Sequence, residues 1–266
     1  MRGCLLLLTF GFILAAAPAY AGAWTAPQGQ GLFIGNATYY TTDHYFDTSS
    51  SKQSQPRFSK VEFQPYVEYG VQNWLTLGGS AYAQAVEQSD KSNYGLADPE
   101  IFARTRVWHD DKQVVSLQPL LKFGSDFDHD NPPRGGSKSV DAELSVLYGR
   151  NLQLTSNRDY VDVRTGYRVR SDGLGDEFRG DVALGLGVTD NIQIIPALRT
   201  VVAVNPTTTP TFTESGDLDY SEVKAEVTGI YNLDTKRWVQ ATVFSDVAGM
   251  QTGDGGGFSL GFAQRF

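Results

Sequence analysis

The chain has almost no cysteine, a deficit of basic residues and no long apolar run beyond its start. Its one cysteine, Cys4, lies in a segment that we expect to be removed, which excludes a disulfide scaffold, a cysteine-ligated zinc site and cysteine catalysis in the mature protein. The formal net charge is −8, from 22 Lys+Arg against 30 Asp+Glu. This acidity argues against nucleic acid as a partner. Beyond residue 21, no stretch approaches the roughly 18 apolar residues of a transmembrane helix.

The N-terminus has the pattern of an export signal. Arg2 gives a short positive start, and residues 5–16 form an apolar run that is too short to cross a bilayer comfortably. Ala19-Tyr20-Ala21 then supplies the small-x-small pattern of a cleavage site. We therefore predict a cleaved signal peptide over residues 1–21, a mature start at Gly22, and export by a Gram-negative bacterium. An N-terminal membrane anchor is the disfavoured alternative.

The mature chain is rich in glycine, aromatic residues and period-two alternation. The full sequence contains 28 Gly, 13 Tyr and 15 Phe but only 2 Met, a mix that favours strands and tight turns over helix bundles. Over residues 161–169 the odd positions are Val, Val, Thr, Tyr and Val, whereas the even positions are Asp, Arg, Gly and Arg. A strand directs these two sets to opposite faces, whereas a helix would mix them.

About twelve segments of the chain show this alternation. They cover residues 30–46, 58–71, 74–88, 98–109, 112–124, 139–150, 158–171, 177–189, 191–204, 218–233, 236–248 and 256–266. The connections after the even strands are short, whereas those after the odd strands, at 47–57, 89–97, 125–138, 172–176, 205–217 and 249–255, are mostly longer and polar. Short turns at one end and longer loops at the other are typical of outer-membrane barrels.

The sequence therefore predicts an all-β fold, a 12-stranded antiparallel transmembrane β-barrel over residues 22–266 with short periplasmic turns and longer extracellular loops. A soluble β-sandwich would show the same alternation, because it also has one apolar and one polar face. The predicted signal peptide, the loop lengths and the last strand favour the barrel. Four tryptophans, Trp24, Trp74, Trp108 and Trp238, are predicted as anchors at the membrane interface.

The last strand resembles the final strand of bacterial outer-membrane barrels. Phe258, Leu260, Phe262 and the terminal Phe266 share one face, although Gln264 departs from the pattern. In those proteins such an ending is read as an insertion signal. The resemblance implies the barrel-assembly machinery as a partner, with outer-membrane lipid and lipopolysaccharide surrounding the barrel.

Two short motifs carry a second resemblance. The mature start has Ala-Trp-Thr-Ala-Pro-Gln-Gly-Gln-Gly at residues 23–31, and Gly-Leu-Ala-Asp-Pro-Glu at 95–100 leads into an arginine-bearing strand. Together they are similar to small outer-membrane barrels described as transporters of the phenol-degradation meta pathway, and to XagA-like proteins associated with surface polysaccharide. The resemblance implies a 12-stranded barrel and supplies no catalytic residue.

With the apolar faces on lipid, the opposite faces line the interior and carry both signs of charge. The candidate constriction residues are Arg104, Arg106, Arg164, Arg168, Arg199, Glu68, Lys224 and Glu226. A guanidinium pairs bidentately with carboxylates and stacks on aromatic rings, so such a constriction would pass small anionic or aromatic solutes. The alternative is a ladder of ion pairs that keeps the interior neutral. A barrel of about twelve strands is wide enough for a narrow pore and narrow enough to be closed by side chains.

Two function hypotheses follow. The first is a passive channel whose partner is a small-molecule solute, and the second is a non-conducting surface barrel that supports export of, or attachment through, a surface polysaccharide. An enzyme is not expected, because His44 and His109 fall at opposite ends of the predicted barrel. No cofactor is expected.

One loop resembles the first half of a calcium-binding loop. Asp126, Asp128 and Asp130 have the required spacing. However, Asn131 stands where the loop needs glycine, and Ser137 stands where it needs glutamate. The sequence therefore favours a solvated acidic loop over a metal site.

Overall fold

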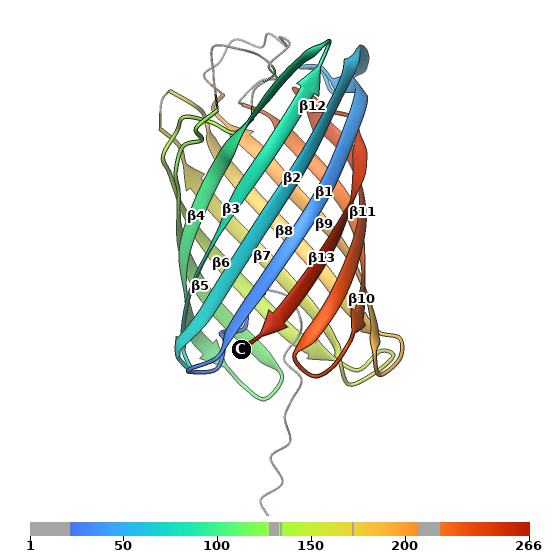
Figure 1. Ribbon diagram of the computed structural model, residues 1–266. Coiled ribbons are helices and arrows are strands. Elements are labelled where there is room, and N and C mark those ends of the chain that lie inside the picture. The colour runs from blue at the N-terminus through green and yellow to red at the C-terminus, as the bar shows by residue number, and fades with distance from the viewer. Residues whose placement is uncertain (1–21, 128–132, 134, 172, 207–218) are drawn as a thin grey trace, which may run out of the picture.

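The computed structural model describes residues 22–127, 133, 135–171, 173–206 and 219–266. The predicted signal peptide lies outside the described residues, and so do Asp128 and Asp130 of the candidate calcium loop. The described chain forms a closed 12-stranded antiparallel β-barrel without helices (Figure 1), as predicted. In the described ranges, no helix has the length and apolarity needed to cross a membrane.

The strands follow one another around the barrel in chain order. They are β1 Gly31–Phe46, β2 Lys52–Gln72, β3 Leu75–Gln88, β4 Lys91–His109, β5 Gln113–Lys122, β6 Asp141–Leu152, β7 Asp159–Val169, β8 Asp176–Gly187, β9 Ile192–Val204, β10 Ser221–Asn232, β11 Arg237–Met250, β12 Thr252–Gly253 and β13 Gly256–Arg265. β1 closes the barrel by pairing with β2 on one side and with β12 and β13 on the other. β12 and β13 lie along the same edge of β1, so together they form one wall strand.

Three of the predicted polar loops are wrong in extent. The predicted 249–255 loop is mostly strand, because β11 ends at Met250 and β12 covers Thr252–Gly253. β2 begins at Lys52 instead of residue 58, and β4 begins at Lys91 instead of residue 98. β3 and β4 are joined only by Ser89 and Asp90, both with positive φ (51° and 63°), as in a tight two-residue hairpin turn. A strand that extends beyond the lipid needs no apolar face, so its sequence can be polar throughout. Such a sequence resembles that of a loop, although the hydrogen bonds between the strands continue. The 123–140 and 205–220 connections remain long.

The short turns at the other end of the barrel are fixed by aspartates. Asp110 accepts hydrogen bonds from the amides of Lys112 (2.7 Å) and Gln113 (2.8 Å), and these bonds lower the pKa of its carboxyl group. Asp234 accepts in the same way from Lys236 and Arg237 (2.8 Å each), again with a lowered pKa. Aspartate favours such turns because its side chain replaces a backbone acceptor. We call this end of the barrel the short-turn end and the opposite end the long-loop end.

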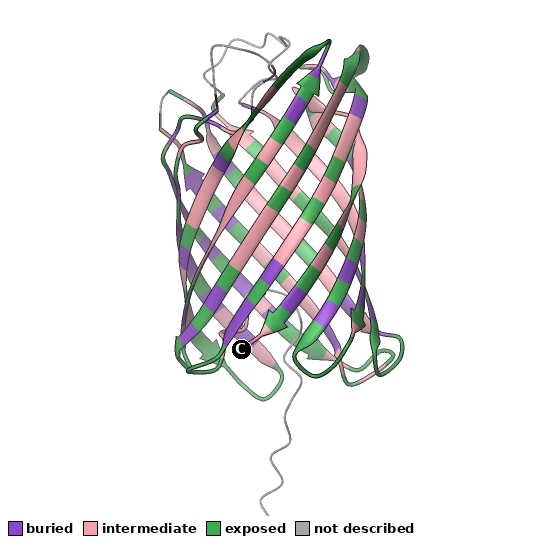
Figure 2. Cartoon of the chain, in the orientation of Figure 1, coloured by how far each residue is buried: buried purple, intermediate pink, exposed green. Residues whose placement is uncertain are grey.

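The two faces of each strand differ as the alternation predicts. On β11, Val239, Val243 and Val247 are exposed (40%, 62% and 53%), whereas Gln240 and Asp246 are buried. Figure 2 shows this alternation of exposed and buried positions along the strands. A soluble sandwich would bury its apolar face, so this barrel, which presents large apolar side chains outward around its wall, excludes that alternative.

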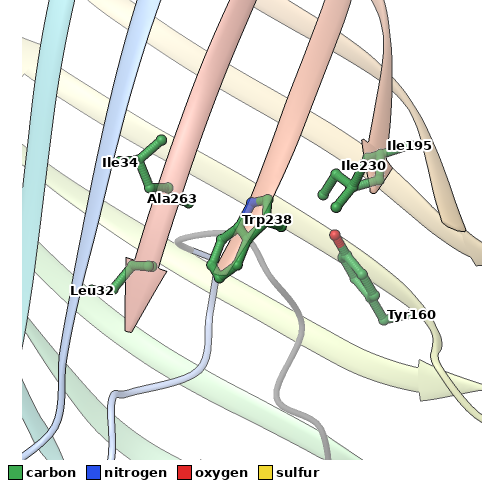
Figure 3. Packing of buried hydrophobic residues seen from close by; sticks show 7 residues of the cluster. All are labelled: Leu32, Ile34, Tyr160, Ile195, Ile230, Trp238 and Ala263. Atoms are coloured by element: carbon green, nitrogen blue, oxygen red, sulfur yellow. The ribbon is translucent and has the colours of Figure 1, made fainter. Parts of the chain in front are cut away.

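An apolar cluster fills part of the interior at the short-turn end. It consists of Leu32, Ile34, Tyr160, Ile195, Ile230, Trp238 and Ala263, all buried (Figure 3). Trp74 and Trp108 point outward and are half exposed, as membrane anchors should be. Trp238 is only 2% exposed, so its predicted place at the membrane interface is wrong. Its indole lies inside the barrel, where Nε1 donates to Gln240 (3.2 Å).

Val163→Arg tests the assignment of faces. Val163 lies near the middle of β7 and is 36% exposed on the outer surface. Arginine there is expected to lower the free energy of unfolding in lipid vesicles by about 2–4 kcal/mol, the cost of a cation on the lipid face near the midplane. Urea denaturation followed by gel mobility without boiling measures the change. Thr38→Arg is the matched control, because Thr38 pairs with Glu62 on the inner face and the new cation would meet a carboxylate. Equal losses in both variants would refute the assignment.

Candidate functional site

The interior of the barrel is the candidate site, and it holds seven of the eight predicted constriction residues in ion pairs. These are Glu68, Arg104, Arg164, Arg168, Arg199, Lys224 and Glu226. Arg106 stands apart. It forms no ion pair within 4.0 Å among the described residues, and it lines a small recess at the short-turn end together with Trp24 and His109.

Arg104 is the most deeply buried of the interior cations. Its Nη1 contacts Glu68 Oε2 at 3.2 Å, and its Nε donates to Gln118 Oε1 at 3.0 Å. The Tyr66 hydroxyl donates to the same Glu68 oxygen at 2.7 Å, and the Phe102 ring lies 5.2 Å from the guanidinium carbon. With its side chain only 2% exposed, Arg104 serves as an internal brace and offers no open anion site.

Arg104 also holds a segment that the alternation could not place. Residues 22–30, which we call the N-terminal segment, enter the barrel at the short-turn end and precede β1 (Figure 1). Arg104 Nη1 donates to the carbonyl of Trp24 at 3.0 Å, and Ser116 Oγ donates to the carbonyl of Ala23 at 2.6 Å. The amide of Ala26 donates to Thr76 Oγ1 at 2.7 Å. The segment is therefore anchored to β3, β4 and β5 from the inside.

Trp24 fixes the same segment by packing. Its ring meets Tyr160 edge-on at 5.9 Å, and it packs against the buried side chains of Val114 and Leu147. Gly149 lies directly under the indole, and a β-carbon there would lie 2.5 Å from the ring. Sequence reasoning placed Trp24 at the membrane interface, and this was wrong. The available signal was an uncharged segment with a large aromatic between the predicted cleavage site and the first strand.

A continuous ladder of alternating charges runs across one wall of the interior. Its members, in order of contact, are Glu100, Arg168, Glu143, Arg164, Asp181, Arg199 and Glu226, contributed by β4 and β6 to β10. Glu143 is the hub, since its fully buried carboxylate contacts Arg164 and Arg168 and lies 3.9 Å from Arg179. Of the two predicted arrangements, the contacts in this wall match the ion-pair ladder.

A second set of ion pairs lies toward the long-loop end. Arg170 contacts Glu177 at 3.1 Å and Asp219 at 3.3 Å, and Lys122 contacts Asp141 at 2.8 Å. Lys224 contacts Glu222 at 2.8 Å and Asp246 at 3.6 Å, and the Tyr40 hydroxyl donates to Asp246 at 2.8 Å.

The opposite wall is polar but uncharged over much of its height. Gln240 Nε2 donates to Asn36 Oδ1 at 2.9 Å, and the hydroxyls of Thr228 and Thr242 are hydrogen-bonded at 2.8 Å. In register beside them, β13 contributes Ser259 opposite Thr242. The interior is therefore asymmetric, with a charged wall on β6 to β10 and a wall on β11, β13 and β1 whose middle is polar and uncharged, between Asp246 toward one end and Arg265 toward the other. We call this wall the neutral wall.

The interior arginines differ in how far they reach open space. The side chains of Arg104, Arg168 and Arg170 are 2–5% exposed, whereas those of Arg164, Arg179 and Arg199 are 24%, 27% and 45% exposed. Arg164 and Arg199 both approach Asp181, at 3.5 and 3.8 Å. A solute inside the barrel would thus meet these three guanidiniums and not the buried ones.

Other predicted residues fall elsewhere. Phe258, Leu260, Phe262 and Phe266 point outward, with 39–58% of each residue exposed, where they are open to lipid or to a partner. Asp126 accepts a hydrogen bond from the amide of Leu96. Among the residues that the structure describes, no three His, Cys, Asp or Glu side chains are grouped so that they could hold a metal ion.

Comparison with known proteins finds likeness in the fold. No family model and no curated protein matches the chain. The COG4313 outer membrane channel from Pseudomonas putida F1 superposes with a TM-score of 0.75 at 14% identity, covering 93% of this chain and 99% of that one. NanC porin gives 0.54 at 10% identity over 87% and 98%, and the CymD monoaromatic hydrocarbon channel gives 0.50 at 9% over 91% and 89%. The chain therefore shares the barrel architecture of outer-membrane channels.

Proposed function

We propose that the protein is a passive channel in the outer membrane of a Gram-negative bacterium and that it passes small anionic or aromatic solutes. The protein would arrive there after its signal peptide, residues 1–21, has been removed. The observation that carries the proposal is the polar interior of a barrel whose outer face is apolar. Such an interior is characteristic of water-filled barrels. The channel architecture of the structural neighbours supports the same reading.

The exposed guanidiniums support the choice of solute. Arg199 keeps 45% of its side chain open, and Arg164 lies on the other side of Asp181. A carboxylate could pair with either guanidinium, and an aromatic ring could stack on its flat face. The neutral wall would offer hydroxyl and amide groups to the rest of the solute. This solute class agrees with what the resemblance to phenol-degradation transporters implies. The resemblance itself remains a prediction.

Single-channel recording of the refolded protein in a planar bilayer tests the proposal. We expect discrete openings and, across a KCl gradient, a reversal potential that indicates anion preference. Arg199→Ala should reduce the chloride-to-potassium permeability ratio at least twofold, because the most exposed interior cation is lost. Arg237→Ala is the matched control, since Arg237 pairs with Asp234 in an exposed turn outside the wall. Faster uptake of benzoate than of benzyl alcohol into vesicles would support the solute class.

A silent barrel would overturn the channel proposal. The ion-pair ladder and the N-terminal segment both narrow the interior, and this observation favours the second candidate, a surface barrel that supports polysaccharide export or attachment. A protein that shows the gel shift of a folded barrel, yet never conducts, would support that candidate. Binding of surface polysaccharide to whole cells that display the protein would then be measured.

A further inference from the structure

One interior carboxylate lacks the cation that its neighbours have. Glu68, Glu143 and Asp181 each contact an arginine. Asp162 on β7 has no lysine or arginine within 4.0 Å among the described residues, and Arg104 and Arg199 attract it only from beyond that distance. Its one hydrogen bond there comes from the backbone amide of Ala23, at 2.7 Å. A carboxylate partly withdrawn from water without a cation is costly, so this position calls for a positive partner.

The backbone of Gly22 lies directly against that carboxylate. A β-carbon built on Gly22 would overlap the Asp162 side chain, so no larger residue fits without displacing it. The Gly22 nitrogen is bonded to the same Cα. Because the amide of Ala23 already donates to Asp162 Oδ2, the Gly22 nitrogen is only one residue away from a group that contacts this carboxylate.

We propose that signal-peptide removal after Ala21 creates the missing cation, and that the α-ammonium of Gly22 pairs with Asp162 and locks the N-terminal segment inside the barrel. In the precursor, the Gly22 nitrogen belongs to a neutral amide. Cleavage turns it into an amine with an ordinary pKa of about 7.7–8.0, which is largely protonated at neutral pH. The inference rests on the cleavage site that forms part of the proposed function.

The surrounding contacts are arranged to hold the new terminus in place. The carbonyl of Ala23 is bound by Ser116, and the carbonyl of Trp24 is bound by Arg104. These bonds fix the chain immediately after the Ala23 amide, which itself donates to Asp162, so the terminus is held close to that carboxylate. Seating of the segment is therefore coupled to processing, and a chain with a blocked terminus would seat less firmly.

The test compares the mature chain refolded from Gly22 with two variants. Asp162→Asn keeps the shape and removes the charge of the carboxylate, and N-α-acetylation of Gly22 removes the charge of the terminus in an unmodified sequence. Trimming of residues 22–27 by a broad-specificity endoprotease, which is too large to enter the barrel and does not need a free α-amine, reports how often the segment leaves. We expect both variants to be trimmed at least tenfold faster than the parent. Asp181→Asn, which removes the same charge from a carboxylate paired with arginines, should be trimmed at the parental rate.

The possible outcomes separate this inference from the channel proposal. Parental trimming rates in both the Asp162→Asn and the acetylated proteins would overturn the pairing. The inference also assumes cleavage after Ala21. Mass spectrometry of the exported protein that shows an N-terminus other than Gly22 would therefore overturn the pairing. Faster trimming of both variants would support the pairing even if every protein were silent in the bilayer, because trimming does not depend on conduction.

Discussion

Glu143→Gln is expected to lower the free energy of unfolding by about 3–5 kcal/mol, the range found when one partner is removed from a buried ion pair. Glu143 has a fully buried side chain, and its carboxylate oxygens lie within ion-pair distance of Arg164, Arg168 and Arg179. Glutamine preserves the volume but leaves these guanidiniums without their common anion. Denaturation by urea in vesicles, followed by loss of the gel shift, measures the change.

The same variant is expected to alter conduction. With one negative charge removed beside three cations, the chloride-to-potassium permeability ratio should rise at least twofold in planar bilayers. Asp234→Asn is the control, since this carboxylate pairs with Arg237 in an exposed turn, where ion pairs contribute little. An unchanged urea midpoint and an unchanged reversal potential would show that the ladder is not the electrostatic centre of the interior.

The alternation of side chains was enough to predict the architecture and the inward set. A period of two assigns every residue of a strand to one of two faces, and the predicted export signal together with the C-terminal aromatic strand predicts which face meets lipid. Partners within a hairpin follow from the register, as Glu143 opposite Arg168 and Arg164 opposite Asp181 show. The contact between Glu100 of β4 and Arg168 of β7 skips two strands. This contact depends on how the closed barrel wall curves, and the curvature cannot be predicted from a local sequence pattern.

The alternation could not predict the interior apolar cluster or the place of the N-terminal segment, for different reasons. Trp238 and Ile195 obey the alternation, yet face inward as part of an apolar cluster against which Trp24 of the N-terminal segment packs. The segment itself has no period, and its contacts are with strands 40 to 139 residues away along the chain, from Gly70 to Asp162. Only the arrangement in space brings Ala23 to Asp162 and Trp24 to Tyr160.

Removal of residues 22–27 is expected to raise the single-channel conductance at least threefold. The N-terminal segment occupies the short-turn end and is bound by Arg104, Ser116 and Thr76 from three strands, so its loss would clear space inside that end of the barrel. Arg104 would keep Glu68, and the wall should remain closed. Recording from a chain refolded from Gln28, beside one refolded from Gly22, measures the effect.

Trp24→Ala in the full mature chain tests whether the indole keeps the N-terminal segment inside the barrel, because the segment is still present but has lost this side chain. Truncating the indole withdraws an aromatic side chain from Tyr160, Val114 and Leu147, at a cost of about 3–5 kcal/mol, while the backbone contacts of the segment remain available. We expect rapid transitions between the conductance of the complete chain and that of the truncated chain, because the segment would leave and return. If the truncated and complete chains instead conduct equally, the segment does not obstruct the path, and the solute must pass along the neutral wall beside Asn36 and Gln240.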